Sequence, residues 1–122
     1  MMKYPLRPAI LALALLITIV ALGACGGGSE PEDREFDLEI KGEKMDPTVV
    51  TVKQGDDVTL RIRTSTAGAF HIHGYDLMQR LDTDSMSTIQ FTADATGRFS
   101  LVLHLVGMGD ERNLGSLEVH PR

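Results

Sequence analysis

Short segments in which apolar and polar residues alternate run through most of this chain, and they restrict its fold more than any other feature. Residues 36–40 (FDLEI) and 58–63 (VTLRIR) alternate strictly, and residues 48–52 (TVVTV) are all β-branched. Successive side chains of a β-strand point to opposite faces, so a period of two is typical of strands with one buried face. Further strands are expected around the histidines of residues 69–76 and at 90–92, 99–105 and 114–119, with a loop at 64–68.

No segment of ten or more residues shows the 3.6-residue period of a helix. Strands that recur about every 8–12 residues, with turn residues between them, are typical of sandwiches and barrels. The sequence therefore predicts an all-β fold, a small sandwich of two sheets. In residues 99–105 (FSLVLHL), alternation predicts that Phe99, Leu101, Leu103 and Leu105 face the core. Val102 and His104 then point to the other face.

The N-terminal residues carry signals of export and lipid attachment. Lys3 and Arg7 precede an apolar run at 9–22, which has the length of a signal-peptide core and is shorter than the roughly 20 residues of a membrane span. The run ends in Leu-Gly-Ala-Cys, which resembles the bacterial lipobox, whose cysteine is lipidated and becomes the mature N-terminus. The alternative is a simple anchor helix with an incidental cysteine. The expected parts of the chain are a signal peptide (1–24), the lipidated Cys25 with a flexible Gly-rich linker (25–34), and one domain (35–122).

Lipid attachment predicts a protein anchored to a membrane outside the cytoplasm, on the periplasmic side or at the cell surface. Loss of Lys3 and Arg7 with the signal peptide leaves ten basic residues against 17 acidic ones, a net charge of −7. This charge argues against nucleic acid as a partner. Cys25 is the only cysteine, so no intramolecular disulfide can form. The chain has no Gly-x-Ser-x-Gly elbow or phosphate-binding loop, and we expect it not to be an enzyme.

Two of the four histidines, His71 and His73, lie two residues apart in a predicted strand. Residues i and i+2 of a strand share one face, so the two imidazoles are neighbours. Such a pair is a start for a metal site, and it is equally compatible with a hydrogen-bonded structural pair. Both readings remain open from the residues alone.

Three stretches of the chain resemble cupredoxins. Residues 47–60 resemble the second and third strands of that family, residues 91–99 (FTADATGRF) the stretch before its copper-binding strand, and residues 115–119 (GSLEV) its last strand. The resemblance implies a Greek-key β-sandwich of about seven or eight strands. It also implies a position for the cysteine of a blue-copper site, which is Leu103 here, so we expect no blue-copper electron carrier.

Residues 70–74 (FHIHG) resemble the His-x-His-Gly motif of multicopper oxidases. In that family the two histidines bind the oxygen-reducing copper cluster, and a histidine three residues earlier, at the position of Gly68, binds the blue copper. A histidine after the blue-copper cysteine also binds the cluster, and His104 matches it. The resemblance thus implies copper ligands at His71, His73 and His104, and Met108 lies in the loop that carries further ligands in the family.

Two functions follow as hypotheses. The first is an exported lipoprotein that binds copper through a His-only site, with the membrane and a copper-handling or envelope protein as partners. The second is a metal-free cupredoxin-like module for structure or protein interaction at the cell surface. Met45 is expected in a loop or at the rim, Met78 and Met86 are expected to fill gaps in the packing, and Asp110 and Glu111 are expected to be solvated loop charges.

Overall fold

The computed structural model describes residues 27–122. The predicted signal peptide and Cys25 lie outside the described residues. Among the residues described, no helix is long and apolar enough to cross a membrane.

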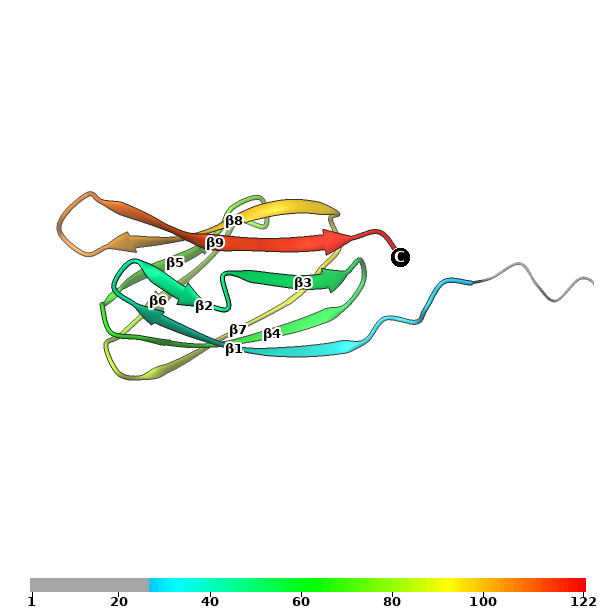
Figure 1. The fold of residues 1–122 in the computed structure, drawn as a ribbon, viewed down its shortest axis with the longest axis horizontal. Helices are drawn as coiled ribbons and strands as arrows, with labels where there is room; N and C mark the ends of the chain where they lie inside the picture. The colour runs from blue at the N-terminus through cyan, green and yellow to red at the C-terminus, as the bar shows by residue number, and fades with distance from the viewer. Residues whose placement is uncertain (1–26) are drawn as a thin grey trace, which may run out of the picture.

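The described chain forms two packed β-sheets without helices, as the alternating sequence predicts (Figure 1). One sheet has the order β2-β1-β4-β7 and the other the order β3-β9-β8-β5-β6. The nine strands of the described residues, against the seven or eight expected, are β1 (Asp33–Lys41), β2 (Lys44–Asp46), β3 (Val49–Lys53), β4 (Asp57–Thr64), β5 (Gly68–Ile72), β6 (Leu77–Leu81), β7 (Met86–Thr92), β8 (Gly97–Leu105) and β9 (Glu111–His120).

The inward-facing residues of both sheets form one aliphatic core. On β8, Leu101 and Leu103 are fully buried, and Phe99 and Leu105 pack against the core from its edges. This confirms the face predicted from alternation. Val102 is also 4% exposed, although it does not belong to the core cluster. A register irregularity between Leu101 and Val102 interrupts the pairing of β8 with β9.

Two strands were not expected from the sequence. Strand β2 has only three residues, too few to show a period, and its Met45 is 2% exposed in the core rather than in a loop or at the rim. Strand β6 shows no clear alternation because an apolar residue, Met78, points outward with 62% of its surface exposed. Met86 is also exposed, at 49%, so neither methionine fills a gap in the packing. Strand β7 begins at Met86, before the expected start at residue 90, and only residues 65–67 separate β4 from β5.

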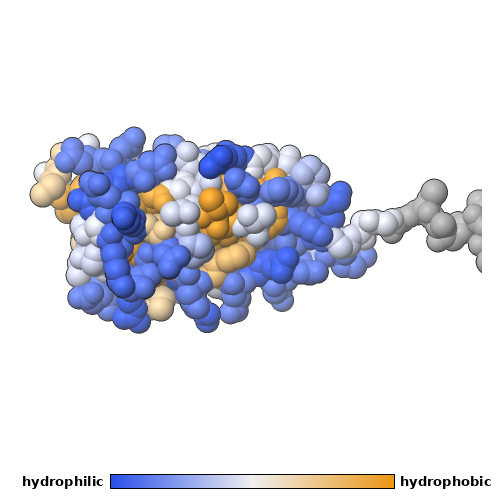
Figure 2. Space-filling view, viewed as in Figure 1, coloured by the Kyte–Doolittle hydropathy of each residue, from blue (hydrophilic) through white to orange (hydrophobic). Residues whose placement is uncertain are grey.

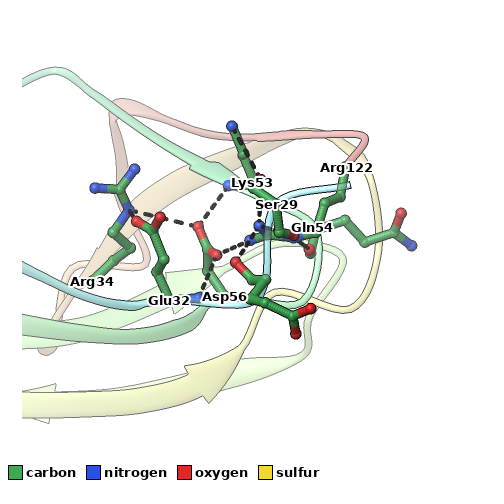
Figure 3. A network of polar contacts seen from close by, with 8 residues as sticks. Ser29, Glu32, Arg34, Lys53, Gln54, Asp56 and Arg122 are labelled. Carbon is green, nitrogen blue, oxygen red and sulfur yellow. Dashed lines mark hydrogen bonds and ion pairs between the residues drawn. The ribbon is translucent and has the colours of Figure 1, made fainter. Parts of the chain in front are cut away.

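The buried carboxylate of Asp56 holds one end of the sandwich together (Figure 3). The backbone N–H groups of Lys53 and Glu32 donate to its two oxygens at 2.9 and 3.1 Å. The guanidinium of Arg122 binds the same carboxylate, and Arg34 lies 3.7 Å from it. Asp56 therefore joins the start of β1, the β3–β4 turn and the residues after β9.

Part of the expected linker belongs to this arrangement. Strand β1 begins at Asp33, two residues before the expected domain boundary, and pairs with Asp57 of β4. Arg122 also donates to the backbone carbonyl of Ser29 at 2.6 Å. Residues 29–34 are thus held against the domain by hydrogen bonds and strand pairing.

We predict that stability falls in acid because of Asp56. Burial raises the pKa of this carboxyl, but the donors from Lys53 and Glu32 and the charges of Arg122 and Arg34 more than offset it and lower the pKa below 3.8. A lowered pKa stabilises the fold above the unfolded-state value, and this contribution is lost as the pH falls through the folded-state value. Denaturant unfolding measured from pH 6 to pH 2 should show a loss beginning near pH 4.

The matched pair of variants is Asp56→Asn and Asp37→Asn. Asp56→Asn should cost about 3 kcal/mol at neutral pH and flatten the acid dependence, because it leaves the largely buried guanidinium of Arg122 without its charged partner. Asp37 is exposed and accepts two hydrogen bonds from Arg61, so its loss should cost less than about 1 kcal/mol. Equal losses in the two variants would contradict the role given to Asp56.

Candidate metal centre

Strand β5 carries two of the predicted histidines to the outer face of the five-stranded sheet. Phe70 and Ile72 are fully buried in the core. Because side chains alternate, His71 points away from the core, and His73 follows on the same side directly after the strand ends. The backbone N–H of His73 donates to the carbonyl of Ser100 at 3.0 Å and so continues the pairing of β5 with β8.

The register between β5 and β8 brings the third histidine to the same face. His71 lies opposite Val102, and His104 lies opposite Ala69, one diagonal step away. One nitrogen from each of His71, His73 and His104 lies within 4.8 Å of the other two. The ring centroid of His71 is 4.3 Å from that of His73 and 5.7 Å from that of His104. The three imidazoles that the sequence singled out therefore converge.

One nitrogen of this group is buried without a hydrogen-bond partner. Nε2 of His104 is shielded from solvent, and no described residue hydrogen-bonds to it. A buried polar atom without a partner typically costs about 1–3 kcal/mol. Since two other imidazoles lie nearby, a metal ion shared by all three rings would give this nitrogen a partner.

Two carboxylates lie near the rings. Oε2 of Glu111 lies 3.7 Å from Nδ1 of His104, and Oδ1 of Asp76 lies 3.9 Å from Nε2 of His71. Carboxylates commonly orient metal-bound histidines by accepting a hydrogen bond from the nitrogen that does not bind the ion. Sequence reasoning missed Glu111 as a site residue, because its position opposite His104 depends on the pairing of β8 with β9.

The turn after the histidines is fixed by aromatic packing. Gly74 has a φ of +93°, and a Cβ there would lie 2.5 Å from the ring of Phe99. Tyr75 packs its ring edge against Phe99, with centroids 4.8 Å apart, and its hydroxyl donates to the carbonyl of Ala95 at 2.7 Å. Burial raises the pKa of the Tyr75 hydroxyl. Phe99 and Tyr75 thus hold the turn that positions His73.

The positions that the resemblance assigns to blue-copper ligands are used for packing. A Cβ at Gly68 would lie 2.6 Å from the backbone oxygen of His104, so no side chain fits there. Leu103 is fully buried in the core, on the opposite face of β8 from His104. The surface that carries the three histidines is therefore separate from the interior position that a blue-copper cysteine would occupy.

The remaining candidates are Met108 and His120. Met108 follows His104 by four residues in the β8–β9 turn, where it is 71% exposed. Figure 2 shows apolar residues at the tip of this hairpin, and further apolar patches near the middle of the same face. The fourth histidine, His120, is the last residue of β9 and lies 3.6 Å from a carboxylate oxygen of Glu118.

The sequence matches the family described as the cupredoxin-like domain over residues 9–110. The chain belongs to this family. Its fold is similar to that of the blue copper oxidase of Nitrosomonas europaea, with a TM-score of 0.60, 22% identity and 74% of this chain covered. The cupredoxin-like chain spans 39% of the length of that oxidase. No curated protein matches it significantly in sequence.

Two smaller structures are also similar to this cupredoxin-like domain. A copper binding protein in its apo form has a TM-score of 0.59 and 13% identity, with 76% of this chain and 93% of that chain covered. The metal binding domain of the Cu(I)-exporting P-type ATPase of Streptococcus pneumoniae D39 has a TM-score of 0.57 and 14% identity, with 75% and 98% covered. At these identities the similarity shows the fold alone.

We predict that Gly74→Ala destabilises the domain by about 3 kcal/mol, because it combines backbone strain with a clash against Phe99. Gly107→Ala is the control, since Gly107 has a φ of +79° but nothing within 4 Å of its missing Cβ. That variant should lose only about 1 kcal/mol. Chemical denaturation measures both, and equal losses would show that Phe99 does not fix the turn.

Proposed function

We propose that this protein is an exported, lipid-anchored cupredoxin-like protein that binds one copper ion through His71, His73 and His104. The observation that carries the proposal is the buried, unpartnered Nε2 of His104, which lies in a group of three converging imidazoles. Buried polar atoms in folded proteins nearly always have a partner, and a bound ion would supply one to this nitrogen.

The donor set fits copper. Imidazole nitrogens suit Cu(II), and three of them leave coordination positions open for a further ligand. Two nitrogens that share an ion at about 2.0–2.1 Å, as measured for zinc sites, lie roughly 3–4 Å apart, so the present 4.8 Å limit requires only small ring rotations. When bound, copper supplies a redox-active Lewis acid at the sheet surface. Without a cysteine thiolate it would lack the intense blue absorption of a blue-copper site.

Several features support handling of the metal rather than catalysis. The site lies on an outer face of the sheet, where a partner could reach it, and His73 is exposed. We therefore propose capture or delivery of copper in the cell envelope, with a copper-handling envelope protein as partner and no enzymatic reaction.

The second candidate function is a metal-free structural or interaction module. The 4.3 Å separation of the His71 and His73 rings favours it, because paired rings can stabilise the turn by packing alone. In this case His104 would contribute to stability, and copper would not bind.

Replacement of His104 separates the two candidates. We predict that His104→Leu leaves the stability of the metal-free protein unchanged or raises it by up to about 1 kcal/mol, because it removes an unsatisfied buried nitrogen. The same change should abolish saturable Cu(II) binding. In the detergent-solubilised full chain, Cu(II) at a hundredfold excess over its Kd should stabilise the wild type by about 2.7 kcal/mol, and this gain should vanish in the variant.

His120→Leu is the matched control, because it removes the one histidine outside the group. It should retain Cu(II) binding at one ion per chain. Loss of stability in metal-free His104→Leu, together with a wild-type melting temperature that does not respond to copper, would favour the structural module.

Lipid attachment is tested separately. We predict that Cys25→Ser moves the protein from the membrane fraction to the soluble fraction or blocks its maturation, because the acyl chains would have no attachment site. Labelling with a radioactive fatty acid should mark the wild type and not the variant. Membrane retention of an unlabelled Cys25→Ser protein would indicate a simple anchor helix instead.

A further inference from the structure

We infer that Met78 supplies a thioether ligand with which the same site holds Cu(I). This inference rests on the proposed function and extends it from one oxidation state to two. Met78 lies in strand β6, and the proposed three-histidine site does not depend on it.

The register places Met78 next to the site. His71 of β5 lies directly opposite Met78 of β6 in the antiparallel pairing. Directly opposed residues have their side chains on the same face, with Cβ atoms about 4.5–5.5 Å apart. Since His71 points outward from the sandwich, the side chain of Met78 leaves the sheet on the histidine face.

The exposure of Met78 has no explanation in packing. Its side chain is 62% exposed, whereas Met45 is 2% exposed and belongs to the core. The core side of β6 is supplied by Leu77 and Leu81 instead, of which Leu81 is 1% exposed. Met78 is therefore an apolar side chain on an edge strand, beside a metal-binding candidate, with no packing role of its own.

The Met78 side chain is flexible, and its sulfur suits copper. Methionine has three rotatable bonds beyond its Cα, and its sulfur is soft and polarisable. Edge strand β6 has no further strand beyond it in the sheet to restrict this movement. Thioether ligands favour Cu(I), while imidazole accepts Cu(II), so a site with three histidines and one methionine can hold copper in both states.

The other two exposed methionines of the described residues, Met86 and Met108, provide controls. Met86 begins β7 and pairs with Arg63 of β4, so it belongs to the other sheet. Met108 lies in the β8–β9 turn, beyond the end of the pairing between His104 and Glu111. Neither occupies a register position beside His71.

The test compares Met78→Leu, Met86→Leu and Met108→Leu in the full chain in detergent. Leucine approximates the volume of methionine and removes the sulfur, so each variant should keep the fold. Cu(I) affinity is measured without oxygen by competition with a colorimetric Cu(I) chelator, and Cu(II) affinity by titration. Met78→Leu should weaken Cu(I) binding at least tenfold and change Cu(II) binding less than twofold.

The Cu(II)/Cu(I) potential gives an independent readout. A tenfold selective loss of Cu(I) affinity lowers the potential of the bound ion by about 59 mV. Met86→Leu and Met108→Leu should leave both affinities and the potential unchanged. The inference is overturned if Met78→Leu behaves like Met86→Leu, or if the loss follows Met108→Leu instead. A wild-type protein that binds neither ion would overturn the proposed function together with the inference.

Discussion

The burial of Phe70 and Ile72 is the constraint on which the histidine site depends. Both side chains are fully buried, so strand β5 cannot slip by one residue without moving them to solvent and the imidazoles into the core. Burial of imidazoles without hydrogen-bond partners would cost free energy. The burial of Phe70 and Ile72 thereby fixes the outward direction of His71 and His73, because a one-residue slip of β5 would be unfavourable.

Strand β8 supplies core residues on one face and a histidine of the candidate site on the other. Leu101 and Leu103 serve the core, while Val102 and His104 face the other side. Val102 lies opposite His71 on the same face of the sheet and is 4% exposed, so it gives the site an apolar neighbour outside the core cluster. An apolar neighbour lowers the local dielectric and excludes water, which strengthens the interaction of the imidazoles with any ion they share.

Local alternation was enough to predict the sandwich and the outward direction of His104, because both depend on neighbouring residues of one strand. The sequence could not predict features that arise from pairing between distant residues. Glu111 near His104, Met78 beside His71 and Arg122 on Asp56 each depend on a register or a contact that no local pattern encodes. Strand β2 was missed for a different reason, since three residues show no period.

The network of contacts around Asp56 also fixes where the N-terminal segment meets the domain. It lies at the end of the sandwich where the N-terminal segment and the last residues meet, whereas the β8–β9 hairpin projects from the opposite end (Figure 1). His104 is seven residues from Gly97 along β8, about 23 Å at the rise of a strand. Ser29 accepts a hydrogen bond from Arg122, and from Cys25 to Ser29 the chain can span at most about 14 Å. A lipid at Cys25 would therefore hold this end of the domain close to the membrane, with His104 and the β8–β9 hairpin at the end that faces away from it.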